Sequence, residues 1–270
     1  MRFTILGSKG FIGSDLTNYL KTKNCEVSTP DISEIGSENL GHVIYCIGIT
    51  SDFRERPYDT INSHVSILND FLKSRNFESF LYLSSTRVYM NASSTKEENS
   101  LSVNPNNFTE IYNISKIMGE SICLASKKAN IRIARLSNVI GNNFKSDDFI
   151  YSLIHDAIKK KKVLLHSQLN SEKDYISIKD VVEILYKISL KGKSKIYNIA
   201  NGNNLSIEKI INLLKDLTSC DVQIDNNAKT ISFGEINVDK IKNEFEFKPK
   251  LIEEEIQDLV IEYRDNYSKL

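Results

Sequence analysis

The chain has 270 residues, of which 40% are hydrophobic and 26% are charged, a balance typical of a folded globular protein. Lysine plus arginine and aspartate plus glutamate each total 35, so the net charge is zero and gives no electrostatic case for nucleic acid as the main partner. No apolar run approaches the length of a membrane span, and the chain opens directly into a strand, which together favour a cytoplasmic protein. The four cysteines have no paired spacing, so we expect neither a disulfide framework nor a metal site.

A glycine-rich turn joins the first expected strand, residues 2–6, to the first expected helix, residues 14–23. Glycines at such a junction let the backbone approach a pyrophosphate closely, while the start of the helix offers unpaired N–H groups and a positive dipole end. The spacing is Gly-x-x-Gly-x-x-Gly, which differs from the usual dinucleotide fingerprint and is weak evidence alone. The residues that we expect to contact a dinucleotide here are Gly7, Gly10, Phe11, Ile12 and Gly13.

A second expected strand, residues 25–29, ends near Asp31, about 20 residues beyond the glycines. A carboxylate at this point binds the adenosine ribose hydroxyls of NAD and repels the additional phosphate of NADP. Asp31 could instead be a turn or capping residue after Pro30. Together with the glycines, Asp31 favours NAD over NADP.

Strands and helices alternate through the next hundred residues. The expected strands are 42–47, 80–83 and 131–136, and the expected helices are 59–74 and 108–127. This alternation predicts an α/β fold with a doubly wound parallel sheet of the Rossmann type, covered by helices on both faces. Polar residues that follow such strands face the ligand crevice at the carboxyl edge of the sheet.

The second half of the chain is less regular. The elements expected here are a helix at 149–162, strands at 163–166 and 174–178, a helix at 180–190, a strand at 195–200, a helix from a Ser206 cap to 217, and helices at 239–245 and 252–267. We expect an NAD(P)-binding Rossmann domain over residues 1–140, to which 179–200 return. A small C-terminal substrate-binding lobe is expected over 141–178 and 201–270.

A candidate proton-transfer pair lies on the expected helix 108–127, where Tyr112 and Lys116 are one turn apart on one face. A free tyrosine has a pKa of about 10, so it needs help to act near neutral pH. An adjacent ammonium and a positive nicotinamide ring both favour phenolate, and the Ser85 hydroxyl at a strand end can orient the reacting oxygen. A Tyr-x-x-x-Lys pair by itself is more often an ordinary exposed helix pair, so the interpretation depends on the combination with the glycine turn.

In this order, these features resemble the extended short-chain dehydrogenase/reductase family, and more narrowly its nucleotide-sugar epimerase/dehydratase branch, over nearly the whole chain. Supporting matches are Ser84–Tyr89, Arg135–Gly141, Lys173–Ile176 and Tyr197–Ala200. The resemblance implies that Tyr112 is the acid/base, that Lys116 binds the nicotinamide ribose and tunes the tyrosine, and that Ser85 touches the sugar. It also implies cofactor contacts at Gly48 and Asn62, although Asn62 could equally be a solvated helix residue. The implied substrate contacts are Thr86, Asn138 and Lys173.

The chain departs from the family pattern at several positions. Thr86-Arg87 stands where the dehydratases carry an Asp-Glu pair, which disfavours 4,6-dehydration. The strand and helix that normally precede residue 42 are absent, and bulkier His64 and Val65 replace small residues. Lys173 replaces an arginine, so it can pair with a diphosphate only as a point charge.

The resemblance implies hydride transfer between NAD and a ring carbon, C4 above all, of a nucleoside-diphosphate sugar. A 4-epimerase fits best, because Asp31 favours a tightly held NAD that is regenerated in each cycle. An NADH- or NADPH-dependent 4-ketoreductase stays open as an alternative, as does a non-catalytic NAD(H)-binding protein. The family's habits also imply a homodimer built from helices 59–74 and 108–127 and a role in surface-polysaccharide biosynthesis.

Overall fold

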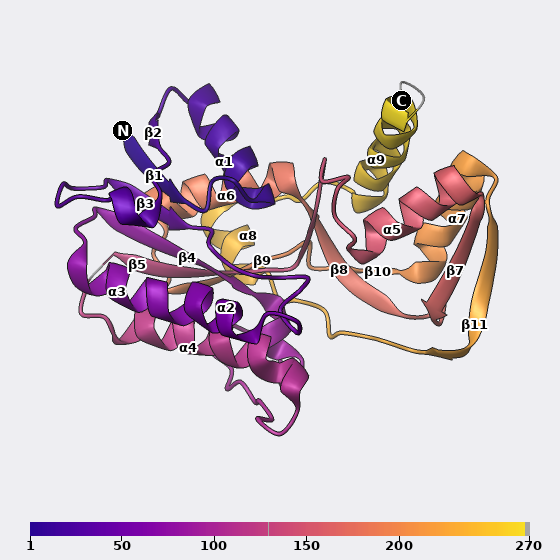
Figure 1. The fold of residues 1–270 in the computed structure, drawn as a ribbon, viewed down its shortest axis with the longest axis horizontal. Helices are drawn as coiled ribbons and strands as arrows, with labels where there is room; N and C mark the ends of the chain where they lie inside the picture. Colours follow the sequence, from indigo (N-terminus) through magenta and orange to yellow (C-terminus); the bar gives the residue numbers. More distant parts are fainter. Residues whose placement is uncertain (129, 268–270) are drawn as a thin grey trace. The chain divides into compact units, whose positions relative to one another are not determined.

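The computed structural model describes residues 1–128 and 130–267, which fold into two compact units (Figure 1). The first unit comprises Met1–Ser137, Ile178–Ile199 and Asn237–Phe247. The second comprises Asn138–Ser177, Ala200–Ile236 and the chain from Lys248 onward.

A six-stranded sheet forms the centre of the first unit. Its spatial order is β2(Glu26–Ser28), β1(Arg2–Leu6), β3(His42–Tyr45), β4(Ser79–Ser85), β5(Ile131–Leu136) and β9(Ile196–Ile199), and every neighbouring pair is parallel. The order reverses direction at β1, so the crevice between the carboxyl ends of β1 and β3 is the topological switch point at which such sheets bind ligands. The predicted doubly wound sheet of the Rossmann type is therefore confirmed.

Helices cover both faces of this sheet (Figure 1). One face carries α1(Phe11–Thr22) and α6(Ile178–Lys191), which contact each other, and the other carries α2(Pro57–Ile61), α3(Ile67–Ser74) and α4(Ile111–Ala125). The buried core beneath the second group is aromatic and aliphatic, with Tyr45, Phe71 and Tyr82 among its members. Burial of these large rings supplies much of the hydrophobic stabilisation of this layer.

The helix expected at 59–74 is interrupted by a π-helical turn at Asn62–Ser66. Two tyrosines of the sheet reach the backbone of this turn: the Tyr45 hydroxyl donates to the Ser63 carbonyl at 2.6 Å, and the Tyr82 hydroxyl donates to the His64 carbonyl at 3.4 Å. Carbonyls that accept bonds from outside the helix are drawn away from its regular ladder, which accounts for the wider turn.

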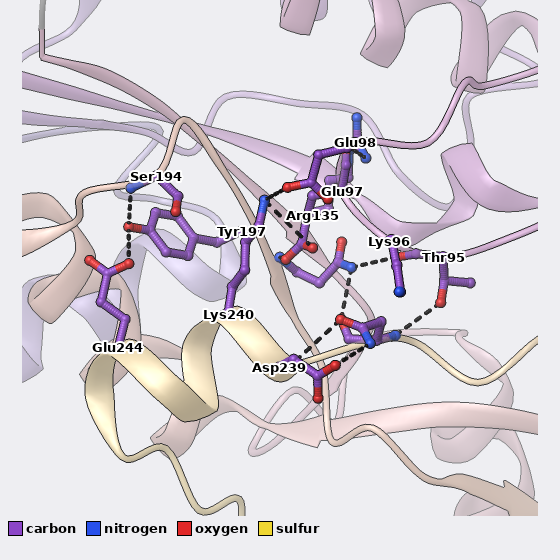
Figure 2. Close-up of polar contacts among 12 residues, drawn as sticks. Thr95, Lys96, Glu97, Glu98, Arg135, Ser194, Tyr197, Asp239, Lys240 and Glu244 are labelled. Atoms are coloured by element: carbon purple, nitrogen blue, oxygen red, sulfur yellow. Dashed lines mark hydrogen bonds and ion pairs between the residues drawn. The ribbon is translucent and has the colours of Figure 1, made fainter.

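A short helix returns to the first unit near the end of the chain, although the sequence analysis placed its residues in the C-terminal lobe. This helix, α8(Asp239–Phe245), packs against β9. The Tyr197 hydroxyl donates to the Glu244 carboxylate at 2.8 Å, and Lys240 forms an ion pair with Glu98 (Figure 2). The fully buried Ile241 and the Phe245 ring, 5.8 Å from that of Tyr197, add apolar packing to these polar contacts.

The second unit contains two small sheets. One has the order β10(Asn204–Ser206), β8(Glu172–Ser177), β6(Asn138–Ile140), and the other pairs β11(Asp221–Lys229) with β7(Lys162–Ser167) in parallel. Its helices are α5(Phe149–His155), which continues into a π-helical turn at Asp156–Lys160, α7(Ile207–Thr218) and α9(Ile252–Tyr267). The Ser206 side chain accepts from the Lys209 N–H, as expected of a helix cap. Strand β11 was not predicted, because its sequence is largely polar and exposed.

Candidate functional site

The glycine turn lies at the end of β1, where the backbone leaves no room for side chains. Gly7 has φ +84°, and a Cβ there would lie 2.9 Å from the Cys46 carbonyl carbon. A Cβ on Gly13 would lie 2.3 Å from the Gly7 carbonyl oxygen, whereas one on Gly10 would make only an ordinary contact at 3.5 Å. Gly7 and Gly13 therefore permit the close packing of the turn, and Gly10 keeps its outer side clear.

Helix α1 begins at Phe11, three residues earlier than expected, with Gly10 as its N-cap. Phe11 and Ile12 thus occupy the first turn, whose N–H groups have no partners within the helix. A helix start preceded by glycines at a switch point suits a pyrophosphate, so the turn fits the diphosphate of a dinucleotide.

Asp31 lies beside this turn. Its exposed carboxylate is 3.3 Å from the ammonium of Lys9, a residue of the glycine turn itself. The backbone N–H of Asp31 also donates to the Glu34 carboxylate at 3.0 Å, so Asp31 caps the 3₁₀ turn Ile32–Glu34. The capping and cofactor interpretations are compatible, since the Asp31 carboxylate remains exposed beside Lys9 and can still face a ribose.

Ser85, Tyr112 and Lys116 come together at the carboxyl end of β4. Ser85 is the last residue of the strand, and its hydroxyl interacts with the phenol of Tyr112, whose pKa it lowers. The same hydroxyl oxygen accepts from the Arg87 N–H at 3.2 Å. The Lys116 ammonium donates to the Leu83 carbonyl at 2.9 Å and lies 5.9 Å from the centre of the Tyr112 ring. A serine, a tyrosine and a lysine arranged in this way can pass a proton to or from a hydroxyl of a bound molecule.

Burial sets the protonation of these groups. It raises the pKa of Tyr112, against the Ser85 hydrogen bond and the positive charge of Arg87, which both lower that pKa. Burial also lowers the pKa of Lys116 to about 7, although the neighbouring Glu120 and Cys46 act in the opposite direction. Contrary to the expectation that the Lys116 ammonium lowers the pKa of Tyr112, burial raises this pKa, and the cation that opposes burial is Arg87.

Gly48 and His64 complete the surroundings of Lys116. A Cβ on Gly48 would lie 3.0 Å from His64 Nε2 and 3.4 Å from Lys116 Nζ, so a larger residue would press on both. His64 is fully buried, and its ring is 5.5 Å from that of Tyr112. The sequence drew attention to His64 only as a bulky departure, because a lone histidine on a helix carries no signal of its packing partners.

The other predicted binding residues lie outside this group of side chains. Asn62 is exposed at the start of the π-helical turn, and Thr86 is half-buried directly after Ser85. Asn138 and Lys173 belong to the second unit, where the Asn138 amide donates to the Asp174 carbonyl at 2.7 Å and the Lys173 ammonium lies 5.8 Å from the Phe149 ring. Substrate contacts from these residues remain predictions.

The described chain, residues 1–128 and 130–267, lacks two kinds of feature, a cluster of metal ligands and a membrane-spanning helix. No three histidine, cysteine, aspartate or glutamate side chains gather there to hold a metal ion. None of the helices described there combines the length and the apolar character that a membrane crossing requires.

A parallel sheet with a glycine turn at its switch point, beside a Ser-Tyr-Lys group, defines an enzyme of the short-chain dehydrogenase/reductase class. The particular family follows from comparison: the model of the NAD dependent epimerase/dehydratase family matches residues 31–200, and the chain belongs to this family. The resemblance inferred from the sequence is confirmed, as is its expectation of an NAD-dependent enzyme.

Relatives within this family carry different activities. The GDP-6-deoxy-D-mannose reductase of Pseudomonas aeruginosa PAO1 is 26% identical over 253 residues, which cover 83% of this chain and 82% of the relative. The solved structure of RMD from Pseudomonas aeruginosa, complexed with NADPH, has a TM-score of 0.80 at 19% identity and covers 98% of this chain and 100% of its own. The UDP-glucuronic acid 4-epimerase of Bacillus cereus, with UDP-glucuronic acid and NAD, has a TM-score of 0.80 at 16% identity, covering 97% and 100%. The two structural likenesses show the shared fold.

Proposed function

We propose that the protein transfers hydride between NAD and C4 of a nucleoside-diphosphate sugar, and that it acts as a 4-epimerase. The observation that carries this proposal is the group at the carboxyl end of β4, where Ser85 lowers the pKa of the Tyr112 phenol and Lys116 Nζ lies 5.9 Å from the Tyr112 ring centre. Such a phenol can hold the hydroxyl at the reacting carbon and exchange its proton.

The residues act on the sugar hydroxyl in a defined sequence. As the C4–H bond breaks, Tyr112 takes the proton of the C4 hydroxyl, and the C4–O bond becomes a carbonyl. NAD, when bound, would supply the acceptor for the hydride released from C4 and the donor for its return. Ser85 holds the carbonyl oxygen. The phenolate form of Tyr112 that accepts the proton is favoured by the Arg87 charge, and the charged form of Lys116, 5.9 Å from the ring centre, would add to that effect. The ketone turns over in the site so that its other face is reduced, and return of the proton from Tyr112 to the C4 oxygen completes the epimerisation.

Elimination of water is disfavoured because the acid and base that it requires are missing. Thr86 and Arg87 follow Ser85, and neither side chain can act as a carboxylic acid or carboxylate. The proposal therefore retains only reactions in which hydride and a proton move at one carbon.

A 4-ketoreductase is the second candidate, favoured by Lys9. Its ammonium lies beside Asp31 at the proposed adenosine ribose site, where it could pair with the additional phosphate of NADP. The similarity to a GDP-6-deoxy-D-mannose reductase supports the same alternative. A non-catalytic NAD(H)-binding protein is disfavoured by the intact Ser85, Tyr112 and Lys116 group.

We further propose that the first unit binds the cofactor and the second the sugar nucleotide, and that α2, α3 and α4 form a homodimer interface. Met118 and Leu124 on α4 are about half exposed, which supports an apolar contact there. Light scattering after size-exclusion chromatography tests the dimer, and a monomer at all concentrations would refute it. A cytoplasmic location and a role in surface-polysaccharide biosynthesis remain predictions.

The decisive experiment denatures the purified protein and identifies any released dinucleotide by absorbance and mass spectrometry. Stoichiometric NAD supports the epimerase, and an empty protein that consumes NADH or NADPH only with a 4-keto sugar nucleotide supports the reductase. Tyr112→Phe should lower the rate by about 10²–10⁴-fold in either case, because the proton carrier is lost. Unchanged activity in this variant would contradict the mechanism.

A further inference from the structure

Two guanidinium groups lie against the ring of Phe53, beside the candidate active site. Its ring is buried and lies 5.2 Å from the Tyr112 ring, measured between centres. The Arg54 guanidinium carbon lies 4.4 Å from the centre of the Phe53 ring, and that of Arg87 lies 5.4 Å from it. One aromatic ring thus holds two cations and contacts the tyrosine.

Neither arginine is neutralised by a carboxylate among the residues that the structure describes. Two nearby acids, Asp52 on this loop and Asp59 on α2, both pair with Arg56, at 3.1 Å and 3.0 Å. Arg54 is exposed and forms no ion pair with the described acids. The two positive charges therefore lie against one aromatic ring without a described carboxylate paired to either of them.

Arg87 is the more constrained of the two. Its Nε is buried, and no described residue hydrogen-bonds to it. Glu110 acts on Arg87 only at a distance, since its carboxylate accepts bonds from the amides of Asn91 and Asn113. Burial and the positive charge of Arg54 both lower the pKa of Arg87. A buried guanidinium N–H without a partner is costly, which is the pattern expected where an anion completes the site.

We propose that Arg54 and Arg87 bind a carboxylate on the sugar ring, so that the substrate is a nucleoside-diphosphate uronic acid. This inference rests on the proposed function, because it takes C4 to be the carbon that faces Tyr112. The C6 carboxylate is attached to C5, the ring atom next to C4. The diphosphate is attached to C1, on the opposite side of the ring. A carboxylate at C6 is therefore the anion that can reach cations next to Tyr112, and the planar forks of two arginines match its oxygens.

The position of Arg87 in the chain supports this assignment. It follows Thr86 in the 3₁₀ turn that begins immediately after Ser85, and its backbone N–H already bonds the Ser85 hydroxyl. Arg87, one of the two residues that stand where the dehydratases carry their Asp-Glu pair, is thus anchored beside the reacting hydroxyl. In this interpretation, the same substitution that removes dehydration chemistry selects an acidic sugar.

Calorimetric titration of the NAD-loaded protein tests the inference with pairs of ligands that differ only at C6. The pairs are UDP-glucuronate with UDP-glucose, dTDP-glucuronate with dTDP-glucose, and GDP-mannuronate with GDP-mannose; UDP, dTDP and GDP alone report binding of the diphosphate. We expect the uronate of one pair to bind about tenfold more tightly than its neutral partner, or more, because charge-assisted hydrogen bonds are the strong ones.

Three variants complete the test. Arg54→Gln and Arg87→Gln should each remove most of the preference for the uronate and leave binding of the free diphosphate unchanged. Arg87→Lys keeps the charge in case the glutamine variant folds poorly, and it should retain only part of the preference because the fork is lost. Arg56→Gln is the matched control: it removes a charge of the same loop that Asp52 and Asp59 already neutralise, and it should keep the preference.

The outcomes separate this inference from the proposed function. If sugar nucleotides bind but no pair shows a preference for the uronate, the carboxylate site is refuted and the proposed function stands. Equal weakening of the uronate and the free diphosphate in the arginine variants would assign these residues to the diphosphate and also refute it. Failure of every sugar nucleotide to bind would overturn the proposed function, and this inference with it.

Discussion

His64 is hydrogen-bonded to Ser115, with 2.8 Å between its Nδ1 and the serine hydroxyl oxygen, and the contact is fully buried. The other ring nitrogen, Nε2, accepts from the Ile49 N–H at 3.2 Å, so Nδ1 must carry the proton and donate to Ser115. Ser115 in turn donates to the Tyr112 carbonyl at 2.9 Å. A neutral histidine thus joins the loop after β3 to helix α4 at the turn that bears the candidate acid/base.

Stability in acid should depend on His64. Burial and the Lys116 charge lower its pKa from an ordinary value of 6.5 to about 2. The unfolded chain binds this proton below pH 6.5 and the folded protein does not, so the free energy of unfolding should fall as pH falls, by up to about 1.4 kcal/mol per pH unit. We expect His64→Gln to be about 1–3 kcal/mol less stable at pH 7.5, because two buried groups lose their partner.

Urea unfolding of both proteins between pH 7.5 and 4.5 measures this effect as a difference in slope. The variant should lose less stability on acidification than the wild type. His166→Gln is the comparison at an exposed histidine, whose surface pair with Asp225 at 3.1 Å should contribute less to the slope than buried His64 does. Parallel curves for wild type and His64→Gln would show that His64 is protonated in the folded state after all.

The buried ion pair of Glu120 and Arg135 should stabilise the fold around the carboxyl end of β4. The guanidinium approaches the carboxylate to 2.6 Å, and both side chains are almost fully buried. The Ser84 hydroxyl donates to the same carboxylate at 2.6 Å, so the pair also fixes the residue before Ser85. Glu120→Gln should cost about 3–5 kcal/mol, because it leaves a buried guanidinium without its counter-charge.

A comparison with an exposed pair isolates the effect of burial. Glu183 and Lys187 form an ion pair on α6 with both side chains well exposed, and Glu183→Gln should cost less than about 1 kcal/mol. Equilibrium unfolding in urea gives both values. Similar losses in the two variants would mean that Glu120 stabilises the protein no more than a surface charge does.

Several features of the site follow from the sequence because they depend on local patterns. A buried strand that runs into glycines predicts the turn at Gly7, and polar residues after β4 predict that Ser85 faces the same edge of the sheet. The spacing of Tyr112 and Lys116 on one helix predicts that they share a face. Each of these predictions needs only neighbouring residues and the rules of parallel sheets.

Other features depend on contacts between distant residues, which no pattern announces. The π-helical turn at Asn62–Ser66 depends on the hydroxyls of Tyr45 and Tyr82, which come from two different strands. Two cations meet on Phe53 only because β4 ends beside the loop after β3. Such contacts combine ordinary residues, so the sequence could indicate them at most as departures from a family pattern.

Two alanine substitutions in the glycine turn should affect different properties, stability at Gly13 and NAD binding at Gly10. Gly13→Ala would place a methyl group 2.3 Å from the Gly7 carbonyl oxygen, so the turn must shift and we expect a loss of about 1–3 kcal/mol in stability. Gly10→Ala meets only an ordinary contact at 3.5 Å and should fold normally. Its methyl group should still weaken NAD binding, because it occupies the side that the diphosphate approaches. Thermal unfolding and NAD titration check both variants, and equal stability would contradict the packing argument.

Asp31 and Lys9 should set the choice between NAD and NADP in opposite directions. Asp31→Asn removes the carboxylate that repels the additional phosphate of NADP, so the ratio of the two dissociation constants should move toward NADP by about tenfold or more. Lys9→Gln leaves the Asp31 charge without its 3.3 Å partner and should move the ratio toward NAD. Both side chains are largely exposed, so neither change should cost more than about 1 kcal/mol in stability, and any effect on binding is direct. Fluorescence titration with NADH and NADPH measures the ratio. If Asp31→Asn leaves it unchanged, Asp31 serves only to cap the turn at Ile32–Glu34.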